Sequence, residues 1–130
     1  WVEGNVNVIL KDIPPEKFIL SVPFYARLWK EGEGGLTSSA VGMQTTSDYV
    51  KSHNLNPTWD EDAKQYTINQ DVNGKSEKIW IENAESVAWK VSLMRKYNLA
   101  GISSWRLGFE TPDVWTAMAD QFSKYQYPYQ

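Results

Sequence analysis

The sequence of 130 residues predicts an α/β fold, and three of its features support that prediction. Two short apolar segments, residues 18–29 and 99–105, both end in large aromatic side chains. Continuous apolar runs are typical of strands buried on both faces, as in parallel sheets covered by helices. Helical periodicity precedes each segment and also follows the second one. Strands that alternate with helices form parallel sheets, and such folds place ligand sites at the ends of their strands.

The composition is that of a globular domain rather than a disordered chain. Hydrophobic residues make up 42% and charged residues 22%, both ordinary values. Aromatic residues reach 14%, with seven Trp and seven Tyr. Such rings either fill a core or stack on carbohydrate, and composition alone does not separate these two uses.

Charge and residue usage exclude several classes of function. The net charge is −3 and no basic cluster is present, so we expect neither nucleic acid nor an anionic membrane as a partner. No apolar run approaches the roughly 18 residues of a membrane span. The chain has no Cys and a single His, so we expect no disulfide, no metal site and no cofactor.

The start of the chain carries no signal peptide. It begins with Trp1 rather than Met, so we expect it to be a piece of a longer protein.

The first predicted element is the end of an amphipathic helix over residues 1–11. Pro14 and Pro15 end this helix and force extended backbone before the first buried strand, residues 18–24. Pro23 lies near the end of that strand, where we expect the pairing to stop or bulge.

The middle of the chain, residues 36–81, predicts a small α+β insertion. Residues 30–42 are rich in Gly, Ser and Thr and are predicted to form a loop. Thr46 or Ser47 can cap a short helix over residues 48–53. Three polar–apolar alternating stretches then predict antiparallel strands near residues 58–61, 65–69 and 77–81. The sequence Asn73-Gly74 predicts the hairpin turn before the last of these.

The final third, residues 82–130, returns to helices and a buried strand. Asn83 is a good N-cap for a helix that runs to Tyr97, and Asn98 can close it in the left-handed conformation. A last helix begins after residues 99–105, with Pro112 at its first position. Its predicted buried stripe is Val114, Met118 and Phe122, and the tail over residues 125–130 is predicted to be irregular. The resulting division is residues 1–35, 36–81 and 82–130.

Two motifs resemble the last two strands of glycoside hydrolase family 18, the chitinase-like barrels. The run from Val22 to Trp29, Val-Pro-Phe-Tyr-Ala-Arg-Leu-Trp, is similar to the seventh strand, usually Gly-x-Pro-x-Tyr-Gly-Arg-x-Trp. Ser21 and Ala26 replace its glycines. The run over residues 98–108 is similar to the eighth strand. The resemblance covers nearly the whole chain, and its branch looks like the spore-cortex and cell-wall enzymes of spore-forming bacteria.

This resemblance implies a partial TIM-type barrel: the last two strands and helices, with the family's small α+β insertion domain between them. A complete barrel of this kind needs about 250 residues. The parent protein would then work outside the cytoplasm, secreted or in the cell wall or spore coat and cortex. It would hydrolyse β-1,4-linked N-acetylglucosamine polymers, which are chitin or peptidoglycan.

One departure from the family limits this expectation. The family's acid motif, Asp-x-x-Asp-x-Asp-x-Glu, is absent from the sequence, and so is its Met-x-Tyr-Asp run. In the family the Glu protonates the glycosidic oxygen while the N-acetyl oxygen of the substrate attacks, and a missing proton donor costs roughly 10² to 10⁴ in rate. We therefore expect no catalytic residue here and an inactive isolated chain. The alternatives are a non-catalytic carbohydrate-binding module of the same fold family and a structural fragment whose open strand edges form an edge-paired or domain-swapped homodimer.

Four residues are predicted to bind the sugar. By resemblance, Trp105 is the ring beneath the sugar at the cleavage point. Tyr25 and Arg27 leave the first strand at its C-terminal end, the end at which barrel enzymes place their sites, although Arg27 could equally pair with a loop carboxylate. Trp29 could border the groove or cover the insertion.

Several other residues are candidates for contact with the ligand or for a local structural role. Glu110 lies just past the second strand and could touch the ligand, whereas Glu82 is expected to help start the nearby helix. The acidic run over residues 60–62 is predicted to be a solvated face, and His53 a surface residue. The aromatic residues that could line the groove wall, but more readily fill the core of the insertion, are Trp59, Tyr66 and Trp80.

Overall fold

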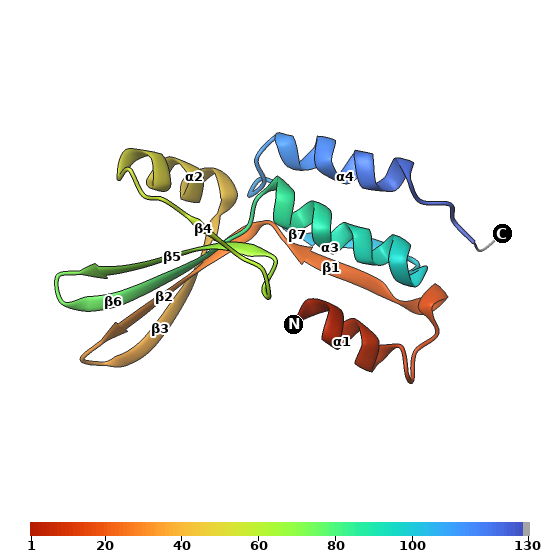
Figure 1. Ribbon diagram of the computed structural model, residues 1–130, viewed down its shortest axis with the longest axis horizontal. Coiled ribbons are helices and arrows are strands. Elements are labelled where there is room, and N and C mark those ends of the chain that lie inside the picture. The colour runs from red at the N-terminus through yellow and green to blue at the C-terminus, as the bar shows by residue number, and fades with distance from the viewer. Residues whose placement is uncertain (129–130) are drawn as a thin grey trace.

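The computed structural model describes residues 1–128, which form two sheets and four α-helices (Figure 1). The helices are α1 (Val2–Ile9), α2 (Met43–Ser52), α3 (Ala84–Tyr97) and α4 (Asp113–Ser123), with a single 3₁₀ turn at Pro15–Lys17. The strands are β1 (Ile19–Pro23), β2 (Tyr25–Gly32), β3 (Gly35–Gly42), β4 (Thr58–Asp60), β5 (Gln65–Val72), β6 (Lys75–Ile81) and β7 (Gly101–Trp105). The expected mixture of helices and strands in an α/β fold is confirmed.

The first part of the segment over residues 18–29 forms a parallel pair with the segment over residues 99–105, as predicted, whereas residues 25–29 belong to the antiparallel strand β2. β1 pairs with β7 from Ile19 opposite Gly101 to Pro23 opposite Trp105. Alternate residues of the pair, such as Val22, are buried against α3 and α4, which cover one face of this small sheet. The other face carries Ile19 and Trp105, which are exposed.

Helix α3 has both of the predicted caps. The Asn83 side chain accepts a hydrogen bond from the Ser86 backbone N–H, and the Ser86 hydroxyl accepts one from the Asn83 N–H. Asn98 closes the helix in the left-handed conformation, with φ 52° and ψ 44°. In α4 the predicted stripe is confirmed at Val114 and Met118 but is wrong at Phe122, which is exposed.

The second sheet is antiparallel, with strand order β3-β2-β6-β5-β4. Helix α2 lies across one face of it, over a core of Ala26, Ile68, Ile79 and Ile81. The hairpin of β5 and β6 turns at Asn73 and Gly74, both with positive φ, as the Asn-Gly signal predicted.

The loop predicted over residues 30–42 is wrong, because these residues belong to the β2–β3 hairpin. Strand β3 is an edge strand whose side chains are exposed along most of its length. It therefore lacks the apolar alternation that marks a half-buried strand, and its backbone pairing with β2 holds it in place. The division predicted between residues 35 and 36 falls inside β3, one residue past the turn of this hairpin.

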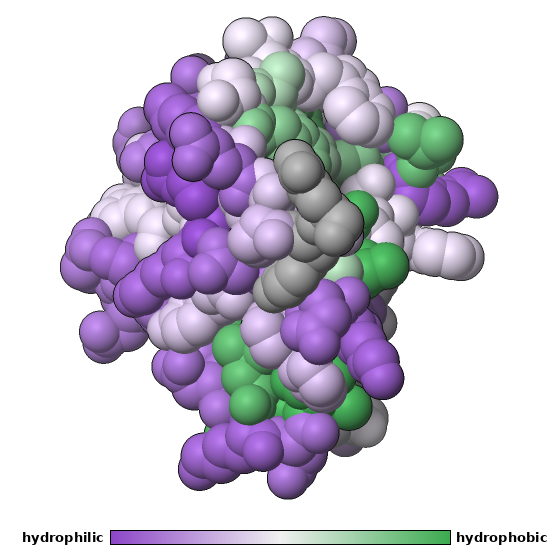
Figure 2. Space-filling model, turned by 90° about the vertical axis from the view of Figure 1, so that its right-hand side faces the viewer, coloured by the Kyte–Doolittle hydropathy of each residue, from purple (hydrophilic) through white to green (hydrophobic). Residues whose placement is uncertain are grey.

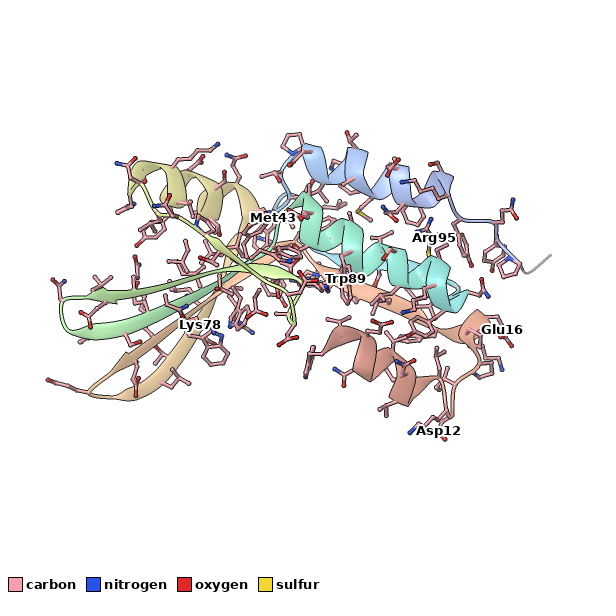
Figure 3. All side chains as sticks on the ribbon, in the orientation of Figure 1. Asp12, Glu16, Met43, Lys78, Trp89 and Arg95 are labelled. Carbon is pink, nitrogen blue, oxygen red and sulfur yellow. The ribbon has the colours of Figure 1, made fainter. Side chains whose placement is uncertain are left out.

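The short helix of this region also starts earlier than predicted. Helix α2 begins at Met43, and Gly42 occupies its N-cap without a side-chain hydrogen bond. Thr46 is not the cap but lies inside the helix and donates to the Gly42 carbonyl, at 3.0 Å. The burial of Met43 in the core beside α3 explains this start, because hydrophobic packing fixes the first turn (Figure 3).

The C-terminal tail has no regular secondary structure over residues 125–128, and the rest of the tail, residues 129–130, lies outside the described part of the chain. Within residues 1–128, none of the helices is both long enough and apolar enough to cross a membrane.

Candidate functional site

A groove with a volume of about 850 Å³ lies between the antiparallel sheet, β1 and α1. Its wall on the sheet side is made by Tyr25, Arg27 and Trp29 of β2 together with Trp80 of β6. Ser21 and Pro23 of β1 and the apolar residues of α1 line the opposite side. The structure thus brings three of the four predicted sugar-binding residues into one groove.

The alternation of side chains along a strand explains this wall. Ala26 and Leu28 of β2 point into the core beneath α2, so their neighbours Tyr25, Arg27 and Trp29 point to the opposite face. No described helix covers that face, which Figure 1 shows on the side of the sheet turned away from α2. The wall is therefore an open sheet face that carries aromatic and cationic side chains.

Register places these side chains in a compact arrangement. Arg27 lies opposite Trp80 on β6, and Trp29 lies opposite Lys78. The Lys78 Nζ lies 4.1 Å from the centroid of the Trp80 ring, and the Arg27 guanidinium carbon lies 5.9 Å from the centroid of the Tyr25 ring. Both are cation–π contacts. The salt bridge considered for Arg27 does not form with any described carboxylate.

Trp105 lies outside the residues that line the groove. It ends β7 opposite Pro23, and its carbonyl accepts a hydrogen bond from the Phe24 N–H at 2.7 Å. The peptide bond between Trp105 and Arg106 is cis. The side chain is 65% exposed, so its indole is not used in the core. Trp105 is thus a neighbour of the groove through Pro23, which lines it.

The ion pair of Glu82 and Lys90 is buried and contributes to the lining of the groove. The Glu82 carboxylate accepts hydrogen bonds from Lys90 Nζ at 2.6 Å, Ser86 Oγ at 2.7 Å and Gln65 Nε2 at 2.5 Å. Glu82 and Lys90 are only 3% and 4% exposed. Burial raises the pKa of the Glu82 carboxyl, and the nearby Lys90 ammonium opposes that rise. With three donors on its two oxygens, this carboxylate is suited to holding the fold rather than to donating a proton.

Sequence reasoning found part of this cluster and missed the rest. Glu82 was expected at the start of the helix, and its bond to Ser86 agrees with that role. The pairing with Lys90 and the link to Gln65 of β5 were missed. Glu82, Ser86 and Lys90 follow one another at intervals of four residues, which is the spacing of one helix face and the signal that could have revealed them.

Of the three aromatic residues considered for the groove wall, one lines the groove and two pack against each other. Trp80 lines the groove, contrary to the core position that was weighed more heavily. Trp59 and Tyr66 pack against each other, with ring centroids 5.0 Å apart, and Tyr66 also packs against the core beneath α2.

The remaining acidic candidates have local structural partners. Asp60 accepts hydrogen bonds from the backbone N–H groups of Asp62 and Ala63, and Glu61 accepts from the Trp59 indole and pairs with Lys64. Glu110 accepts a hydrogen bond from the Gly108 N–H at 2.8 Å. These carboxylates shape turns and lie outside the residues that line the groove.

His53 is exposed and contacts the Tyr49 carbonyl, in agreement with the surface position expected for it. In the described part of the chain, His, Asp and Glu side chains nowhere gather in a group of three or more that could hold a metal ion.

Comparison with known proteins identifies relatives of this fold and groove. The family model described as glycosyl hydrolases family 18 matches residues 2–110. The cortical fragment-lytic enzyme of Bacillus subtilis (strain 168) is 28% identical over 128 residues, which cover 94% of this chain but only 29% of that relative. The chain thus spans about three tenths of the length of the curated relatives that it matches.

Solved structures agree with this match. The chitinase of Chromobacterium violaceum ATCC 12472 superimposes with a TM-score of 0.82 at 25% identity, over 93% of this chain and 38% of that chain. The spore cortex-lytic enzyme SleL of Bacillus cereus superimposes with a TM-score of 0.79 at 25% identity, over 92% of this chain and 29% of that chain.

Proposed function

The chain belongs to the glycosyl hydrolases family 18, and we propose that it supplies the floor and one wall of a groove for β-1,4-linked N-acetylglucosamine polymers. The observation that carries this proposal is the common placement of Tyr25, Arg27, Trp29 and Trp80 along one groove. Flat apolar rings suit the C–H face of a pyranose, and the fixed N–H donors of Arg suit hydroxyl and carbonyl oxygens. Trp105, which is exposed at the end of β7 beside Pro23, is the proposed floor.

The proposed architecture is a partial TIM-type barrel with an insertion. β1 and β7 would be its last two strands, and the antiparallel sheet with α2 would be the insertion domain. Parallel pairing of β1 with β7 and the helices on one face of that pair support this division. We assign Tyr25 to Ile81 to the insertion in place of residues 36–81, because β2 is part of the antiparallel sheet.

The proposed reaction belongs to a longer protein. Because the sequence lacks the acid motif, the proton donor for retaining hydrolysis would come from a segment outside this chain, which would be inactive alone. The relatives named for the spore cortex support an extracytoplasmic substrate such as cell-wall peptidoglycan.

Calorimetric titration of the chain with the N-acetylglucosamine tetramer tests the binding groove. We expect measurable binding, which Trp105→Ala and Trp80→Ala should each weaken by about fivefold or more, since an aromatic contact contributes about 1 kcal/mol. Trp59→Ala is the matched control, because the Trp59 ring packs against Tyr66 and its indole N–H donates to Glu61, outside the groove lining. Circular dichroism establishes that each variant is folded. Absence of binding to the folded chain, or equal losses in the control, would contradict the proposal.

A second candidate is a non-catalytic carbohydrate-binding protein of the same family, since the residues that form the groove would serve binding without hydrolysis. The two candidates differ in turnover and not in binding. The longer protein that contains this chain should release reducing ends from chito-oligosaccharide or peptidoglycan if it is a hydrolase. Binding without release of reducing ends would favour the binding protein.

We also propose that the isolated chain pairs with a second copy through the open edge of β1. Among the described strands, β1 pairs only with β7, so its other edge has free backbone donors and acceptors.

A further inference from the structure

The sheet face that forms the wall of the groove carries cations and indole rings in an alternating pattern, and Lys78 lies on this face beside Trp80 but outside the residues that line the groove. Arg27 lies opposite Trp80, and Trp29 lies opposite Lys78, on the paired strands β2 and β6. Each cation therefore has one Trp across the sheet and another two residues along its own strand. Figure 3 shows Lys78 on β6, on the side of the sheet turned away from α2. We refer to these four residues, Arg27, Trp29, Lys78 and Trp80, as the checkerboard.

The two cations of the checkerboard have no carboxylate partner among the described residues. The nearest carboxylates along the paired strands are Glu31 on β2 and Asp71 on β5. Neither of them forms an ion pair with Lys78. The Asp71 carboxylate instead accepts from the Gly74 N–H.

The acid that lines the groove does not compensate these cations either. Glu82 already pairs with Lys90 and accepts from Ser86 and Gln65. In a chain whose net charge is −3, the checkerboard is therefore a local excess of positive charge beside the groove.

A sugar can stack on the ring face of Trp80 that Lys78 covers only if it displaces the Lys78 ammonium. This ammonium lies 4.1 Å from the centroid of the ring and covers one ring face. A neutral sugar that stacks on that face must displace the ammonium and gives it no anion in return. A sugar that carries a carboxylate displaces the ammonium and then pairs with it, so the lost cation–π contact is replaced by a charged hydrogen bond.

We propose that Arg27 and Lys78 form a subsite that binds carboxylate groups. The groove would then bind an N-acetylated β-1,4 glycan that carries carboxylates, which peptidoglycan has and chitin lacks. This inference rests on the proposed function, because it presupposes that the groove binds a glycan. The carboxylate can come from the lactyl ether of the sugar or from an attached peptide, and both present the same charged group to the subsite.

Four matched oligosaccharides of equal length test the subsite by calorimetric titration in low salt. They are the N-acetylglucosamine tetramer, a peptide-free peptidoglycan tetramer with free lactyl carboxylates, the same tetramer with those carboxylates amidated, and the tetramer with peptides attached to its lactyl groups. We expect the free carboxylate form to bind more tightly than the amidated form by up to about fivefold, as one surface ion pair allows. The preference should shrink at 0.5 M salt (about 4 Å Debye length) because the pair is exposed.

Two variants assign the preference to the checkerboard. Lys78→Met keeps most of the side-chain length without the charge and should remove most of the carboxylate preference, measured as the ratio of the affinities for the free and the amidated tetramer. Lys75→Met is the matched control, because Lys75 is an exposed lysine on the same strand near its hairpin turn, and it should leave the preference unchanged. Preference for the peptide-linked form over the lactyl form would place the carboxylate on the peptide.

The outcomes separate the two proposals. Equal affinity for the free and amidated tetramers, or a preference that persists in Lys78→Met and Arg27→Met alike, overturns the subsite but leaves a glycan-binding groove. Failure of all four oligosaccharides to bind the folded chain overturns the proposed function itself.

Discussion

Glu82 and Lys90 are charged side chains that the chain buries in the lining of its groove. Each would be costly to bury alone, and together they are kept by direct pairing and by hydrogen bonds from Ser86 and Gln65. Glu82 accepts hydrogen bonds from Gln65 of β5 and from Lys90 of α3, so it connects the antiparallel sheet to α3. It fixes how the wall of the groove sits against α3.

Breaking this pair from one side should be strongly destabilising. We expect Glu82→Gln to lower the free energy of unfolding by about 3–5 kcal/mol, because it leaves the Lys90 ammonium buried without a counter-charge. The double variant Glu82→Leu/Lys90→Met should lose less than Glu82→Gln alone. Urea unfolding followed by circular dichroism measures both, with Glu33→Gln as an exposed control. A double variant less stable than the single one would show that the attraction between the charges is itself a net source of stability.

Glu77 predicts a specific dependence of stability on pH. A hydrogen bond from Lys30, which lies opposite it on β2, lowers the pKa of the Glu77 carboxyl below its ordinary value of 4.5. A lowered pKa means that the stabilisation is present above pH 4.5 and is lost as the pH falls through the folded-state pKa. Melting temperatures between pH 7 and pH 3 should therefore fall more steeply in the parent chain than in Glu77→Gln. Parallel pH profiles would contradict this assignment.

Residues of the groove show what a sequence can and cannot predict about a site. The sequence predicts Tyr25 and Arg27 just past the end of the first buried strand, whereas they lie with Trp29 on one face of the separate strand β2. The sequence does not say which face of the sheet a helix will cover, so the core was favoured for Trp80, whereas α2 covers the opposite face and leaves Trp80 in the groove wall. Lys78 and Trp80 are two residues apart on β6 and therefore share a face, but their placement opposite Trp29 and Arg27 depends on the pairing of β6 with β2, which local sequence does not encode.

At the scale of elements, local signals were sufficient where the chain itself supplies the stabilising groups. Helix α3 carries its own caps at Asn83 and Asn98, and the β5–β6 hairpin carries its own Asn-Gly turn, so each was predicted close to its observed bounds. Strand β3 has no such signal. Its exposed Ser and Thr residues are held by pairing with β2, a tertiary interaction that propensity does not encode.

The cap of α3 is the element whose contribution is easiest to measure. We expect Asn83→Ala to destabilise the chain by about 1 kcal/mol, because the Ser86 N–H loses its acceptor at the helix start. Asn7→Ala is a suitable control, since Asn7 is exposed within α1 and caps nothing. Denaturant midpoints of the two variants provide the comparison. Equal stability of Asn83→Ala and the parent would mean that water satisfies the exposed N–H at no cost.

At the scale of the whole molecule, a large apolar surface lies at the end that carries α1. Trp1 is 88% exposed, and Val8, Ile9 and Ile13 are exposed beside it. Figure 2 shows hydrophobic surface gathered over this helix and the segment that follows it. The face of β1 and β7 left open by α3 and α4 adds Ile19. Exposed apolar surface of this kind marks an interaction site or an aggregation liability.

The open edge of β1 gives this surface a specific prediction in solution. We expect the isolated chain to self-associate reversibly, and Ile19→Lys to weaken association by about tenfold or more, because a charge on an edge strand opposes pairing with a second edge. Val72→Lys places the same charge at the distant β5–β6 hairpin and should have no effect. Sedimentation velocity over a hundredfold range of concentration distinguishes these cases. If the parent chain stays monomeric, or if it and Ile19→Lys associate equally, the edge of β1 is not the contact. Loss of association in Ile19→Lys alone would place the second copy on β1.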